Sequence, residues 1–137
     1  MYPEELVAPM RADLTNNGFT ELKDADSVSS VFDSAKGTSL LVVNSVCGCA
    51  AGSARPGAVS SLSGDKKPEN LYTVFAGQDK EATSKAREFL LPYPPSSPSI
   101  GLFKDGELVH FVERHHIEGR SAEMISDHLQ LVYKEYC

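Results

Sequence analysis

The sequence lacks several features that would point directly to a class of protein. Lys and Arg together number 13 against 19 Asp and Glu, and the formal net charge is −6. The basic residues are scattered, so no basic face is available for a nucleic acid. No stretch is apolar for long enough to span a bilayer, and we find neither an internal repeat nor a low-complexity segment. We therefore expect no nucleic-acid partner and no membrane insertion.

The N-terminal segment also lacks the marks of an export signal. The residues MYPEELVAPMRADL include early acidic side chains and have neither a basic start nor a continuous apolar core. A cytoplasmic location is the default expectation, and the cytoplasm keeps thiols reduced. A close pair of cysteines is then more typical of redox catalysis or metal binding than of a structural disulfide.

The length of 137 residues is typical of one domain, 1–137, which can bury a core without disulfides. Helical spacing of apolar residues predicts helices at 3–16, 26–36, 79–91 and 121–136. The second of these is expected to be capped by Asp26 or Ser27. Small residues predict a further helix from Cys49 to Leu62 with a kink near Pro56.

Strands are predicted between these helices. An apolar run rich in β-branched residues predicts a buried strand at 38–45, and others are expected at 71–77 and near 18–22. Residues 99–112 alternate about Asp105-Gly106, which predicts a hairpin. Strands separated by helices imply parallel crossovers. The fold class is therefore α/β, with a mixed central sheet of four or five strands flanked by helices and a C-terminal hairpin and helix.

Two of the three cysteines, Cys47 and Cys49, lie one residue apart in VVNSVCGCAAG, where the predicted central strand ends. Reactive groups gather at the carboxyl ends of strands in α/β sheets, where the following helix directs its N–H groups at them. These groups stabilise a thiolate, so we expect a lowered pKa for Cys47. Gly48 would allow a tight turn and leave the Cys47 sulfur accessible to a large partner.

A disulfide between Cys47 and Cys49 would close a small, strained ring that is easily reduced, which favours a role in thiol-disulfide exchange. Other interpretations stay open: two small residues packed in a turn, a metal or cluster carrier, or a non-catalytic interaction module. The remaining possible ligands, His115, His116 and Cys137, do not stand at a zinc-site spacing from the pair. No metal site is predicted.

The loop PYPPSSP, 92–98, leads into the hairpin. A cis peptide bond between Ser97 and Pro98 would leave the Ser97 backbone free to pair with a substrate, although trans is the more common isomer. The local sequence leaves both isomers open. We expect His115 and His116 in a solvated loop and His128 at the edge of the core.

The order of elements, the thiol pair and SSPSIGLFKDGELV resemble the thioredoxin fold, in which a cis proline faces the redox cysteines before an antiparallel hairpin. The strings VVNSVCGCAAGSARPG, VAPMRADL, VFAGQDKEAT, PSSPS and HFVERHHIEG are similar to the bacilliredoxin family of thioredoxin-like proteins. The resemblance extends from the first helix to Cys137. Its motif has one residue between the cysteines, where ordinary thioredoxins have two.

The resemblance implies an enzyme that removes bacillithiol, or a related low-molecular-weight thiol, from S-thiolated client proteins, with disulfide isomerase or reductase activity as the broader description. Cys47 would be the attacking thiol and Cys49 its neighbour in the CGC motif. Pro98 would be the cis proline, and Gly48, Ser97 and Pro98 would contact the substrate. The small thiol is expected as a co-substrate, with no bound cofactor.

Two basic residues could also meet the carboxylates of such a small thiol. They are Arg55 and Lys80. Isolated charges of this kind are usually solvated, so we expect both to be ordinary surface residues.

Overall fold

The computed structural model describes residues 1–137. Its sheet has five strands in the order β1-β3-β2-β4-β5. The strands are β1 Thr20–Glu21, β2 Thr38–Asn44, β3 Asn70–Phe75, β4 Ser99–Lys104 and β5 Glu107–Val112. β1, β3 and β2 run parallel, whereas β4 is antiparallel to both β2 and β5. The predicted mixed α/β sheet is confirmed.

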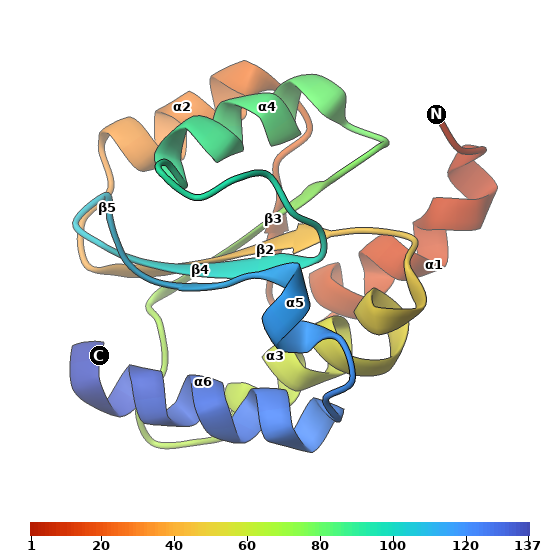
Figure 1. Ribbon diagram of the computed structural model, residues 1–137. Helices are drawn as coiled ribbons and strands as arrows, with labels where there is room; N and C mark the ends of the chain where they lie inside the picture. Colours follow the sequence, from red (N-terminus) through yellow and green to blue (C-terminus); the bar gives the residue numbers. More distant parts are fainter.

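Helices cover both faces of the sheet, with α1, α3 and α6 on one face and α2 and α4 on the other (Figure 1). The helices are α1 Glu4–Thr15, α2 Ala25–Asp33, α3 Arg55–Ser61, α4 Lys80–Phe89, α5 Arg114–Ile117 and α6 Ala122–Tyr136. The N-cap of α2 is Asp24, which accepts from the Ser27 N–H, so the expected cap at Asp26 or Ser27 was wrong. None of the helices is both long and apolar enough to cross a membrane.

The central strand β2 is buried along its whole length. Alternate side chains of a strand face opposite sides of the sheet, so β2 contributes to two apolar layers. Leu40 and Val42 pack with residues of α1, α3 and α6, whereas Leu41 and Val43 pack with residues of α2 and α4. This double cover explains why the segment is a nearly continuous apolar run.

The helix expected at 49–62 is divided into two parts. A π-helical turn, η1, covers Ala50–Ala54, and α3 follows with Pro56 in its first turn. Proline has no N–H group for the helical ladder, so the regular α-helix restarts where that group is not needed. Further along, a Cβ on Gly57 would lie 2.7 Å from the side chain of Ile125, so the small residue allows α3 to pack closely on α6.

The β4–β5 hairpin confirms the strongest local prediction. Both turn residues have positive φ, 52° at Asp105 and 83° at Gly106, as the tight turns of hairpins require. On the other side of β4, Ser99 pairs with Val43 of β2. Because β4 begins directly after Pro98, this register brings the 92–98 loop to the end of β2 that precedes the cysteines.

Candidate active site

The two cysteines follow the carboxyl end of β2, as expected from the sequence. The strand ends at Asn44, whose side-chain oxygen accepts from the Ser45 N–H at 2.9 Å. The Ser45 hydroxyl then accepts from the Cys47 N–H at 3.2 Å, and the Cys47 carbonyl accepts from the Ala50 N–H at 3.0 Å. These hydrogen bonds fix the turn that carries Cys47 out of the sheet.

The thiols of Cys47 and Cys49 are not joined by a disulfide, and they are partly exposed and close together, with 2.6 Å between their sulfur atoms. The Cys49 thiol, the backbone N–H groups of Cys49 and Ala50, and the charge of Arg114 hold the pKa of Cys47 below its ordinary value. Burial and the neighbouring sulfur raise the pKa of Cys49. Cys47 therefore loses its proton first, which makes it the stronger candidate for the attacking group.

Sequence reasoning missed Arg114, the first residue of α5. Its Nη2 donates to the Cys47 sulfur at 3.2 Å, and its Nη1 donates to the Ser97 carbonyl at 3.0 Å. Its Nε pairs with Glu118 one turn further along. One guanidinium thus connects the thiol to the loop before the hairpin. It lies within HFVERHHIEG, but its distance of 67 residues from Cys47 gives no local signal of this contact.

The Ser97–Pro98 peptide bond is cis, which confirms the isomer implied by the resemblance. Ser97 and Cys47 line the same cavity, of about 280 Å³. The Ser97 carbonyl accepts a hydrogen bond from Arg114, so Arg114 is one of the groups that hold this part of the loop beside Cys47. Gly48 has no left-handed φ, and a Cβ there would meet no atom within 4 Å. The turn therefore does not require glycine, and the space around Gly48 is open.

Arg55 is not a surface charge. It is 3% exposed, and its Nη1 donates to the Asn44 side-chain oxygen at 3.0 Å and to the Ser45 carbonyl at 3.1 Å. Its Nε lies 3.1 Å from Asp13 of α1. The prediction failed because these partners come from other elements of the chain, and they make Arg55 a brace beneath the thiol turn. Lys80 is exposed, as expected.

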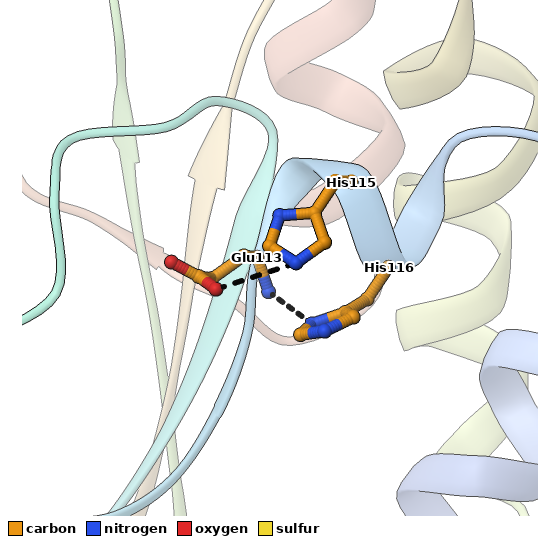
Figure 2. Close-up of side chains that lie close together, drawn as sticks. All are labelled: Glu113, His115 and His116. Carbon is orange, nitrogen blue, oxygen red and sulfur yellow. Dashed lines mark hydrogen bonds and ion pairs between the residues drawn. The ribbon is translucent and has the colours of Figure 1, made fainter.

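A carboxylate and two imidazoles meet at the start of α5 (Figure 2). The His115 Nε2 lies 3.6 Å from a Glu113 oxygen, and the Glu113 N–H donates to the His116 Nδ1 at 3.3 Å. The polar atoms of Glu113 and His116 form a capping box for α5, where a loop was expected. The cluster thus fixes the helical turn that presents Arg114 to Cys47.

The fold and the paired thiols at this strand end define a thiol-disulfide oxidoreductase of the thioredoxin class. The structure is similar to that of thioredoxin O2 from Arabidopsis thaliana in its oxidised state, with a TM-score of 0.55 and 17% sequence identity. The match covers 86% of this chain and 96% of that chain.

The sequence also matches the family described as disulphide isomerase over residues 2–137. A bacilliredoxin of Cytophaga hutchinsonii is 66% identical over 135 residues, covering 98% of this chain and 99% of the relative. A bacilliredoxin of Halalkalibacterium halodurans is 56% identical, covering 99% of this chain and 94% of the relative. The chain therefore belongs to the bacilliredoxin family, which confirms the predicted resemblance.

Proposed function

We propose that the protein removes a low-molecular-weight thiol, bacillithiol or a related compound, from S-thiolated client proteins. The observation that carries this proposal is the setting of Cys47: an accessible sulfur with a lowered pKa, a second thiol 2.6 Å away, and a guanidinium in contact. The name of the curated relatives supports a small thiol as the co-substrate.

The first step is attack by the Cys47 thiolate on the small-thiol sulfur of the client's mixed disulfide. A bond forms between that sulfur and Cys47 while the bond to the client's sulfur breaks. The electron pair leaves on the client's sulfur, which takes a proton from solvent. Cys47 is thereby oxidised and the client cysteine is reduced. Arg114 raises the fraction of Cys47 that is thiolate at neutral pH.

The mixed disulfide on Cys47 can be resolved in two ways. Cys49 can attack the Cys47 sulfur, releasing the small thiol and forming an internal disulfide, or a second small thiol can attack the sulfur bound to Cys47. The short distance between the two sulfurs favours the first way, whereas the raised pKa of Cys49 favours the second. The two ways leave different products, so intact mass distinguishes them.

Disulfide isomerase activity is a second candidate, favoured by the description of the matching family. It would use the same attack, with a disulfide between two protein cysteines in place of the mixed disulfide. Cys47 would be held covalently by the client until another client thiol displaces it. A refolding assay with a client whose disulfides have been scrambled tests this activity directly.

The principal test uses a client protein carrying one mixed disulfide with bacillithiol. We expect Cys47→Ser to abolish release, and Cys49→Ser to retain the first attack and keep the small thiol on Cys47 as added mass. Free small thiol should then clear that mass. Loss of the first attack in Cys49→Ser, with Cys47→Ser nearly unchanged, would reverse the assignment. Equal loss in both variants together with loss of a bound metal would favour a metal carrier.

A further inference from the structure

The cavity beside Cys47 is basic in a protein that is acidic as a whole. Two arginines, Arg87 and Arg114, contribute to its lining, and no acidic side chain does. The chain has a formal net charge of −6, so the charge of this cavity lining is opposite in sign to that of the whole protein. A cavity with two cations and no carboxylate is suited to an anionic ligand.

The two arginines differ in what they already bind. Arg114 has Glu118, the Ser97 carbonyl and the Cys47 sulfur as partners. Arg87, from α4, makes no side-chain hydrogen bond or ion pair within the chain, and its Nε is buried without a partner. Burial lowers the pKa of Arg87, and no neighbouring carboxylate counteracts that effect. A half-buried guanidinium without a partner costs free energy that a bound anion would recover.

The planar guanidinium is a donor for bidentate contacts with a carboxylate. A small thiol held on Cys47 as a mixed disulfide is joined to it through sulfur. The rest of that molecule then lies in or near the cavity that Cys47 and Arg87 both line. The volume of about 280 Å³ lies close to the lower end of the range for small-molecule sites, about 300–1,000 Å³. The cavity therefore suits a small thiol better than a folded segment of a client.

We propose that Arg87 is a binding residue for a carboxylate of the low-molecular-weight thiol, which selects anionic thiols over neutral and cationic ones. This inference rests on the proposed function, since it concerns the small thiol that Cys47 accepts. Arg114 acts on the sulfur, whereas Arg87 acts on the remote end of the molecule. Discrimination among small thiols is then separate from activation of Cys47.

The test measures attack by Cys47 on three small disulfides that differ in charge. The probes are glutathione disulfide, which carries carboxylates, hydroxyethyl disulfide, which is neutral, and cystamine, which is cationic. Cys49 and Cys137 are replaced by serine so that Cys47 is the single thiol. In each reaction a bond forms between Cys47 and one probe sulfur, and the other half leaves as a thiolate that is protonated by solvent according to its pKa.

We expect Arg87→Gln to lower the rate constant for glutathione disulfide by roughly five- to tenfold relative to that for hydroxyethyl disulfide. The rate constant for cystamine should rise, because a repulsive charge has been removed. Arg87→Lys should restore part of the preference through its charge alone. The matched control is Lys85→Gln, which removes a positive charge from the same helix outside this cavity.

An unchanged ratio between the three probes in Arg87→Gln would overturn the inference, as would an equal loss for all three. A second measurement uses the protein with native Arg87: added salt should slow attack on glutathione disulfide more than attack on hydroxyethyl disulfide. Equal salt dependence would also count against a carboxylate site. If no small thiol is released from any S-thiolated client, the proposed function itself fails. Release without a charge preference rejects only the role of Arg87.

Discussion

Arg11 and Arg114 are the same residue type in two opposite settings. The Arg11 side chain is 8% exposed and lies within 2.7 Å of carboxylate oxygens of Glu4, Glu21 and Asp79. Arg114 has one carboxylate partner, Glu118, which is 54% exposed, and directs its other nitrogens at the Ser97 carbonyl and at Cys47. Arg11 is thus fully occupied by acidic partners, whereas Arg114 has nitrogens left over for a reactive group.

The difference shows how a guanidinium can serve either to stabilise the fold or to act on a reactive group. Three carboxylates, from α1, β1 and the start of α4, bind the Arg11 guanidinium, so this side chain ties the three elements together. The same hydrogen bonds raise the pKa of Arg11 further. Near Cys47 acidic groups are scarce, and the positive charge instead favours a thiolate. Each region can be tested by changing its balance of charges.

The largest effect is expected in the Arg11 region. Arg11→Met would leave three carboxylates without their shared cation, and we expect the free energy of unfolding to fall by about 3 kcal/mol. Denaturant unfolding measures this loss. The rate at which Cys47 reacts with iodoacetamide should change by less than about twofold, because Arg11 is not among the charges acting on it. Arg11→Lys is the matched control, and a loss below about 1 kcal/mol in Arg11→Met would contradict the contrast.

The next effect concerns Arg114. We expect Arg114→Gln to slow alkylation of Cys47 at neutral pH by roughly fivefold, because the midpoint of the pH-rate profile moves upward when a cation is removed. The difference should vanish at high pH, where Cys47 is thiolate in both proteins. Arg120→Gln, which removes an exposed positive charge shortly after α5, is the control. A profile with the same midpoint in Arg114→Gln would show that Arg114 does not stabilise the thiolate.

A smaller effect is expected when an acidic side chain is introduced into the lining of the Cys47 cavity, which has none. Val46 lines this cavity, so Val46→Asp places a carboxylate beside its two arginines. Attack by Cys47 should slow by about threefold relative to Val46→Asn, and 0.5 M salt should remove most of that difference. Equal rates for the Asp and Asn variants at low salt would break the comparison with Arg11.

The smallest effect extends the comparison to histidine. His110 and His128 lie 2.9 Å apart between their Nε2 atoms, and burial lowers the pKa of both below the ordinary 6.5. On acidification the unfolded chain takes up these protons first, so this contribution to stability is present above about pH 6.5 and is lost below it.

The loss should stay below about 1 kcal/mol, because both rings are partly solvated. Thermal unfolding at pH 7.5 and pH 5.5 measures it. His128→Gln should show a smaller drop between the two conditions, whereas His115→Gln, which removes an exposed ring, should behave like the unaltered protein. A drop of the same size in all three proteins would remove the pair as its cause.

Local patterns predicted the fold well because they reflect local physical rules. The hairpin follows from Asp105-Gly106, and the position of Cys47 follows from the apolar run that ends at Asn44. The cis isomer before Pro98 came from the family resemblance rather than from the loop sequence. Arg55 and Arg114 were beyond such reasoning, since the residues of the thiol turn that they contact lie 10 or more residues away and are brought close by packing.

The order in which the chain is made gives the Arg114 contact a further consequence. Cys47 is synthesised 67 residues before this arginine and Cys49 follows it closely, so a nascent chain carries the thiol pair without its cation. The guanidinium reaches the sulfur only after β4 and β5 have joined the sheet and α5 has formed behind them. The full reactivity of Cys47 is therefore reached late. By then the rest of the chain is folded, so the reactive thiolate does not form in an unfolded chain.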